Sequence, residues 1–150
     1  MLEVIEQEHD ARPAPKKRRA LLVEDDRDMR RLLGWMLRGE GLEVVEADGG
    51  VELLDWINRT GGDPWRHFFD LIVSDVNMPD LTAIEVLGAL RCRTSKAPVI
   101  LITAFADAEM RREAGELGAC AILDKPLGRN DLRAALRTVS ELGAAEAVNA

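Results

Sequence analysis

Four short apolar runs in this sequence of 150 residues each end in, or are followed by, polar side chains that could do chemistry. Runs rich in Val, Ile and Leu that stop at polar or Pro-containing segments are typical of buried strands. In open α/β sheets, ligands bind at the carboxyl ends of the strands, so these polar groups are expected at one edge. In chain order they are Glu24, Asp25 and Asp26, then Asp75, Thr103 and Lys125.

The residue types in this set favour a site that holds a cation next to a phosphate. Two carboxylates about 5 Å apart repel each other by roughly 3 kcal/mol at an effective dielectric constant of about 20, so clustered acids need positive charge among them. Carboxylate oxygens with no His or Cys nearby suit Mg²⁺, which shares its coordination with water and phosphate. Lys125 adds a fixed cation and Thr103 a hydroxyl donor for a tetrahedral anion. Asp75 would then be the nucleophile that forms an aspartyl phosphate.

The apolar patterns that must position these groups predict strands alternating with helices. Strands are expected over residues 20–23, 42–46, 71–74, 98–103 and 119–123. Asp26 is expected to cap the first helix and Gly118 to end the fourth. Apolar residues at helical spacing predict five helices, each with one side packed on the sheet. In chain order these residues are Met29, Leu32, Leu33, Met36 and Leu37; Val51, Leu54 and Ile57; Leu81, Ile84, Leu87 and Leu90; Met110, Ala114 and Leu117; and Leu132, Ala135, Leu136 and Val139.

This order of elements requires a parallel sheet with helices on both faces, joined by right-handed crossovers. We therefore expect the α/β class, with a doubly wound, five-stranded parallel sheet at the centre of three layers. Residues 19–142 would form this one domain, after a disordered leader at 1–18 and before a frayed tail at 143–150. Since all the predicted helices cover the sheet, no output domain is expected within the chain.

Composition excludes several classes of function. The net charge of -7 and the pI of about 4.9 argue against a nucleic-acid-binding surface, which needs a basic face. No apolar run approaches the roughly 18 residues of a membrane span, and the N-terminal residues lack the features of a signal peptide. We therefore expect a cytoplasmic protein without direct nucleic-acid or membrane partners. Cys92 and Cys120 have no spacing typical of a zinc site or a disulfide framework.

Taken in order, the polar motifs resemble those of the receiver domain of two-component response regulators. The resemblance covers the chain from about Arg19 to Val139. It rests on an acid pair after one strand, an Asp after another, then Thr-Ala and Lys-Pro, here Glu24-Asp25, Asp75, Thr103-Ala104 and Lys125-Pro126. It implies the flavodoxin-like (βα)5 form of the doubly wound sheet.

The resemblance also implies a role for each matching residue. Asp75 would be the phosphoacceptor, and Thr103 and Lys125 would bind phosphoryl oxygens. Mg²⁺ would be bound directly by Asp25 and mostly through water by Glu24. Asp75 and the backbone carbonyl of Asn77 would complete the metal site. Pro126 is expected to follow a cis peptide bond, which costs little only before proline.

The function implied is that of a stand-alone, single-domain response regulator. Such a protein accepts a phosphoryl group from a sensor histidine kinase or a phosphotransfer protein. It then signals to a downstream effector protein through the face formed by the fourth helix, the fifth strand and the last helix. It would not be an enzyme beyond its own phosphorylation and dephosphorylation.

Two alternatives remain open at this point. One is a receiver-like binding module that is not phosphorylated. The other is a phosphatase of the haloacid-dehalogenase type, which also uses an Asp nucleophile, Mg²⁺ and a Lys on a doubly wound sheet. That family places Asp-x-Asp after its first strand, whereas Asp75 follows the third predicted strand and Asn77 holds the second position.

The sequence departs from the usual receiver pattern at three places. Ile122 stands three residues before Lys125, where receivers usually have Tyr or Phe, so a Thr-coupled swing of an aromatic ring cannot be the readout in its usual form. Thr82-Ala83 stands where receivers tend to have Gly, which predicts a different shape for that loop. We further hypothesise that the ring of Phe105 shields the aspartyl phosphate and slows its hydrolysis.

Overall fold

The computed structural model describes residues 17–60, 68–92 and 98–148. Nearly all of the predicted leader, residues 1–16, lies outside the described residues. No helix in these three stretches combines the length and the apolar character needed to cross a membrane.

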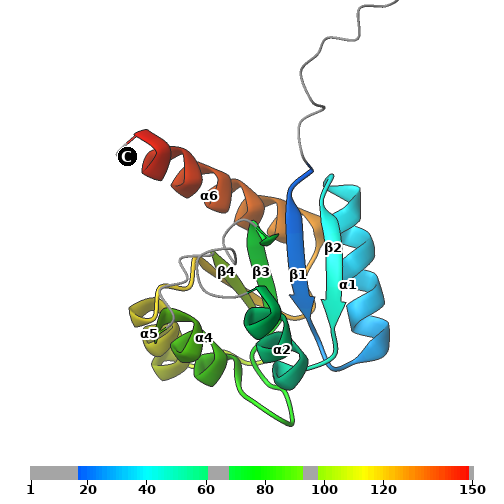
Figure 1. The fold of residues 1–150 in the computed structure, drawn as a ribbon, viewed down its shortest axis with the longest axis vertical. Helices are drawn as coiled ribbons and strands as arrows, with labels where there is room; N and C mark the ends of the chain where they lie inside the picture. The colour runs from blue at the N-terminus through cyan, green and yellow to red at the C-terminus, as the bar shows by residue number, and fades with distance from the viewer. Residues whose placement is uncertain (1–16, 61–67, 93–97, 149–150) are drawn as a thin grey trace, which may run out of the picture.

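A five-stranded parallel sheet forms the centre of the domain, in the order β2-β1-β3-β4-β5 (Figure 1). Each strand lies within two residues of its predicted range, so the predicted sheet is confirmed. Because the strand order reverses between β1 and β3, the carboxyl ends of these two strands flank the crevice where such sheets bind ligands. The strands are β1 (Arg19–Val23), β2 (Glu43–Ala47), β3 (Leu71–Asp75), β4 (Val99–Thr103) and β5 (Ala121–Asp124).

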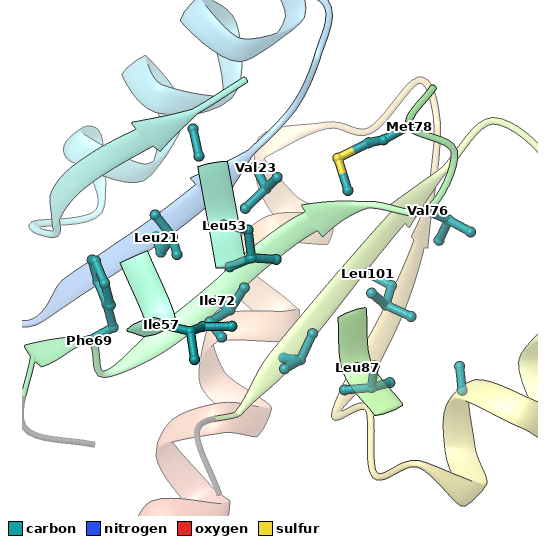
Figure 2. Packing of buried hydrophobic residues seen from close by; sticks show 13 residues of the cluster. Leu21, Val23, Leu53, Ile57, Phe69, Ile72, Val76, Met78, Leu87 and Leu101 are labelled. Atoms are coloured by element: carbon teal, nitrogen blue, oxygen red, sulfur yellow. The ribbon is translucent and has the colours of Figure 1, made fainter. Parts of the chain in front are cut away.

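Helices cover both faces of the sheet, because alternate side chains of each strand point to opposite sides. In β1, Leu21 and Val23 belong to one core cluster, whereas Ala20 and Leu22 belong to the other. The first cluster, shown in Figure 2, is closed by α2 (Gly50–Thr60), α4 (Ala83–Cys92) and α5 (Ala108–Glu116). The second is closed by α1 (Arg27–Gly39) and α6 (Arg129–Val148). The three-layer, doubly wound architecture is therefore confirmed.

Two residues assigned to the buried stripes are exposed instead. Leu32 on α1 has 49% of its surface exposed, and Val51 on α2 has 55%. Their neighbours on the same helices, Leu33 and Leu53, are 1% exposed and fill the core. The prediction was wrong at both positions because apolar spacing gives the period of a helix more reliably than the width of its buried face.

The ends of the helices follow the local sequence signals. The Asp26 side chain caps α1 by accepting a hydrogen bond from the Met29 backbone N–H at 2.8 Å. Gly41 and Gly118 follow the last residues of α1 and α5 with φ angles of 89° and 82°. These left-handed conformations end the two helices at little steric cost only because glycine lacks a Cβ. The caps predicted at Asp26 and Gly118 are therefore confirmed.

The last helix is longer than its predicted apolar stripe. α6 runs from Arg129 past Gly143 to Val148, and its C-terminal part extends away from the sheet (Figure 1). The proposed limits of the domain at residues 19 and 142 remain predictions.

Candidate functional site

Lys125 joins two carboxylates that lie far apart in the sequence. Its Nζ donates hydrogen bonds to Asp75 Oδ2 at 2.9 Å and to Glu24 Oε1 at 3.2 Å. The backbone N–H of Lys125 donates to the Thr103 carbonyl at 2.8 Å, so pairing of β5 with β4 continues up to the lysine. The Lys125–Pro126 peptide bond is cis, as expected. The sheet thus delivers Glu24, Asp75 and Lys125 to one pocket.

Glu24 is held in place by its backbone on both sides. Its N–H donates to the Ala47 carbonyl at 3.1 Å, and its carbonyl accepts a hydrogen bond from Arg30 Nη1 at 2.8 Å. Sequence reasoning did not identify Arg30, which lies in the first turns of α1. The signal that the sequence offered was its position just over one helical turn after the Asp26 cap, which brings an arginine close to the acids.

Burial makes Glu24 an unusual carboxylate. The residue is 1% exposed, and its Oε2 has no hydrogen-bond partner among the described residues. Burial, together with the hydrogen bond and charge of the neighbouring Asp75, outweighs the lowering by Lys125 and raises the pKa of its carboxyl group from an ordinary 4.5 to about 7. A buried oxygen without a partner costs free energy, so this oxygen favours the binding of a positive ligand.

Three carboxylates together form a candidate cation site. Oxygen atoms of Glu24, Asp25 and Asp75 all lie within 4.8 Å of one another, and Asp25 is the solvent-exposed member. One ammonium group cannot neutralise this cluster even when Glu24 carries a proton, so the cluster retains net negative charge. An all-oxygen donor set with one exposed side fits a hard cation that keeps several waters, as Mg²⁺ does. The residues present therefore fit the predicted metal.

The same carboxylates also keep Lys125 charged. Burial by itself lowers the pKa of the ammonium group, but the hydrogen bond and the charge of Asp75, with those of Glu24, outweigh burial. The net effect raises the pKa of Lys125 above its ordinary value. Its side chain is 18% exposed, so one side of the cation remains open to the pocket.

Asn77 and Thr103 stand close to the pocket in different ways. The Asn77 backbone N–H donates to Asp75 Oδ1 at 3.1 Å, which fixes the carboxylate on the side away from Lys125. Thr103 is fully buried at the end of β4, next to β3. Its hydroxyl donates to the Phe105 carbonyl at 3.0 Å and accepts from the Phe105 N–H at 3.1 Å. The structure thus turns the Thr103 hydroxyl toward its own loop.

A pocket of about 320 Å³ opens beside the acids. Glu24 and Lys125 form one side of it, and Met29 and Leu32 of α1 form an apolar wall. The exposure of Leu32, which the sequence placed in the core, is explained by this position. A partner that approaches the carboxylates can therefore make apolar contact with α1.

A doubly wound sheet with acids after its first and third strands and a Lys after its fifth is typical of the receiver class of signalling domains. Comparison with known sequences makes the assignment specific, because residues 20–137 match the response regulator receiver domain. The chain belongs to this family. Phosphorylation-based two-component signalling is the family's standard function, and its members are signalling proteins rather than classical enzymes.

Individual relatives agree with the family assignment. The chain is 38% identical over 120 residues to the transcriptional regulatory protein CpxR of Escherichia coli, covering 79% of this chain and 47% of CpxR. It is 28% identical over 117 residues to the sporulation initiation phosphotransferase F of Bacillus subtilis, covering 78% of this chain and 89% of that protein. The chain therefore spans about half the length of CpxR and most of the length of the phosphotransferase.

A solved structure confirms the fold. The chemotaxis protein CheY4 of Vibrio cholerae superposes with a TM-score of 0.70 at 28% sequence identity, over 83% of this chain and 99% of CheY4. Receiver domains bind Mg²⁺ at an acidic pocket, and this structure has a cluster of acidic residues, Glu24, Asp25 and Asp75. The family assignment leaves no support for the haloacid-dehalogenase alternative.

Proposed function

We propose that Asp75 accepts a phosphoryl group from a histidine kinase or a phosphotransfer protein. One Asp75 carboxylate oxygen attacks phosphorus; an O–P bond forms while the P–N bond of the donor phosphohistidine breaks, and the imidazole leaves with the bonding electron pair. The observation that carries the proposal is the contact of the Lys125 ammonium with both Asp75 and Glu24, next to the Asp25 carboxylate.

Each neighbouring group has a defined part in this step. Lys125, already 2.9 Å from Asp75, neutralises negative charge on the incoming phosphoryl oxygens. Asp25, Glu24, Asp75 and the Asn77 carbonyl are the proposed holders of Mg²⁺. When bound, Mg²⁺ neutralises phosphoryl charge and orients the donor for in-line transfer. The Thr103 hydroxyl is the proposed second donor to a phosphoryl oxygen, which requires it to leave Phe105.

Incubation with acetyl phosphate and Mg²⁺ tests the proposal without a partner protein. The intact mass should increase by one phosphoryl group, because acetyl phosphate supplies an activated phosphoryl group without docking. Addition of a chelator in excess of Mg²⁺ should slow the reaction by at least about 10²-fold, since the acid cluster then repels the donor. Mass spectra that stay unchanged with Mg²⁺ present would contradict the proposal, and equal rates with and without chelator would contradict the metal site.

We place the output on the face formed by α5, β5 and α6. The Arg111 guanidinium of α5 contacts both Asp124 carboxylate oxygens at 3.1 Å, and Asp124 directly precedes Lys125. Displacement of Lys125 toward a phosphoryl group would therefore pull on α5. The site of the usual aromatic is taken by Ile122, which packs partly buried against the core beneath α2, α4 and α5. The proposed message passes to an effector protein by a shift of α5 and β5.

The Phe105 hypothesis gives a separate prediction. The ring is 77% exposed, so it covers little of the pocket in this structure, and shielding would require the loop to close when Thr103 releases the Phe105 backbone. Phe105→Ala should then shorten the lifetime of the aspartyl phosphate several-fold, as measured by loss of phosphoprotein mass after removal of the donor. Phe105→Leu, which keeps an apolar side chain, should retain most of the lifetime. Equal lifetimes in all three proteins would show that the ring does not shield.

A further inference from the structure

The carboxylate of Asp80, in the loop between β3 and α4, caps a helix that begins 30 residues earlier. Its Oδ2 accepts the Val51 N–H at 2.9 Å, and its Oδ1 accepts the Gly50 N–H at 3.1 Å. Oδ1 also accepts the N–H of Leu81 at 2.8 Å. The first N–H groups of a helix have no partner within the helix. In α2 their hydrogen bonds are accepted by Asp80, from the loop that follows Asp75. These backbone hydrogen bonds lower the pKa of Asp80, so the carboxylate is charged at neutral pH.

The contact depends on two glycines at the start of α2. A Cβ at Gly49 would lie 2.9 Å from Asp80 Oδ2, and a Cβ at Gly50 would lie 2.5 Å from Leu81 Cβ. Any side chain at Gly50 would therefore force the loop away from the helix. The pair of glycines and the carboxylate together form a close joint between α2 and the segment 80–81.

The joint lies at the far end of a short segment that starts at the proposed phosphoacceptor. At the near end, the Asn77 N–H is bonded to Asp75 Oδ1 at 3.1 Å. In the middle, Met78 is 6% exposed and packs in the core cluster that Figure 2 shows. Asn77 itself is exposed and stands between these fixed points. The position of its carbonyl is thus set by Asp75 on one side and by Met78 and Asp80 on the other.

We propose that Asp80 is a positioning residue of the cation site, which holds the Asn77 carbonyl in place by tying the loop to the start of α2. The inference rests on the proposed function, because it assumes that the Asn77 carbonyl binds the divalent cation. Without the joint, segment 79–81 separates from α2 and the carbonyl loses one of its restraints. Mg²⁺ affinity then falls because the ligand must be ordered at the moment of binding.

Calorimetric titration with Mg²⁺ of the unphosphorylated protein tests the inference. Asp80→Ala should weaken Mg²⁺ binding by about tenfold, the scale of an outer-shell substitution at a metal site. Gly50→Ala should weaken it similarly although every carboxylate remains, because it displaces Leu81. Asp80→Asn, which keeps one oxygen acceptor, should restore most of the affinity. Hydrogen exchange at the amides of residues 76–78 should be faster in the first two variants.

The matched control is Asp107→Ala. Asp107 caps α5 through the Met110 N–H at 2.8 Å, so this variant also loses an aspartate cap and a comparable amount of thermal stability, but it should bind Mg²⁺ as the unmodified protein does. Unchanged Mg²⁺ affinity in Asp80→Ala and Gly50→Ala would show that Asp80 is a helix cap only and would overturn the inference. Should Asp80→Ala not fold, Gly50→Ala and Asp80→Asn provide the same comparison. Failure of the unmodified protein to bind Mg²⁺ is a distinct result, which would overturn the proposed metal site and this inference with it.

Discussion

Asp75→Asn is expected to take up no phosphoryl group from acetyl phosphate or from a phosphohistidine donor. The amide nitrogen and oxygen of asparagine are far weaker nucleophiles than a carboxylate, and no charge is left to be balanced by Lys125 at this position. The expected effect is loss of the added phosphoryl mass, a reduction of at least about 10³-fold in rate, because nothing else in the pocket replaces the nucleophile. Intact-mass spectrometry over the time in which the unmodified protein is fully phosphorylated measures it.

The Asp75→Asn variant should remain folded. It removes one negative charge from a cluster in which two buried carboxylates share one lysine, so repulsion in the folded state decreases. A melting temperature at or above that of the unmodified protein is therefore expected, and it would assign the lost phosphorylation to chemistry rather than to unfolding.

Asp26→Asn is the matched control for this substitution. Asn caps helices as well as Asp, so the hydrogen bond to the Met29 N–H can be kept. Phosphorylation should persist, because Asp26 serves α1 as a cap and lies outside the cluster of Glu24, Asp25 and Asp75. Phosphorylation of Asp75→Asn at the normal rate would place the acceptor elsewhere, and its loss in Asp26→Asn would make Asp26 part of the site.

The sequence was sufficient to predict the sheet and the acids at its edge, because both follow from local patterns. A buried strand such as 71–75 is encoded in a few consecutive apolar residues, and the carboxyl ends of parallel strands necessarily share an edge. Proximity of Glu24, Asp75 and Lys125 therefore followed from topology alone. Their functional roles remain predictions, because an arrangement of side chains does not by itself measure reactivity.

What the sequence could not predict depends on contacts that the apolar pattern does not encode, whether between distant segments or within one loop. The cap that Asp80 gives to α2 spans 30 residues and has no local signature beyond the glycine pair at 49–50. The hydroxyl of Thr103 could have faced Asp75 or its own loop, and a two-residue hydrogen-bonded turn with Phe105 decided between them. The exposure of Leu32 likewise depends on how wide a face of α1 the sheet covers, which periodicity does not fix.

Lys125→Met is expected to be the most destabilising single substitution in the pocket. It keeps an unbranched side chain of nearly the same length but leaves Glu24 and Asp75, 1% and 6% exposed, without their shared cation. Removal of one partner of a buried ion pair costs about 3–5 kcal/mol, and we expect about 3 kcal/mol because Lys125 is partly exposed and Glu24 can take up a proton. Urea unfolding without Mg²⁺ measures the difference. Arg111→Met, which breaks the exposed pair with Asp124, should cost less than about 1 kcal/mol.

The loss of folding stability in Lys125→Met should depend on pH, because Lys125 affects the protonation of Glu24. The pKa of Glu24 is about 7 in the folded protein and 4.5 ordinarily, so between these values the folded state binds more protons than the unfolded state. Stability therefore falls as pH rises through this window, at roughly 1.4 kcal/mol per unit of pKa difference. Lys125 lowers the pKa of Glu24, so its removal raises that pKa further, which widens the pH window and makes the total fall in stability larger. Unfolding measured at pH 5 and pH 8 should thus give a smaller deficit for Lys125→Met at pH 5. An equal loss of stability at pH 5 and pH 8 would mean that Lys125 stabilises the fold through the packing of its alkyl chain. Another group would then have to balance the negative charge of the carboxylates.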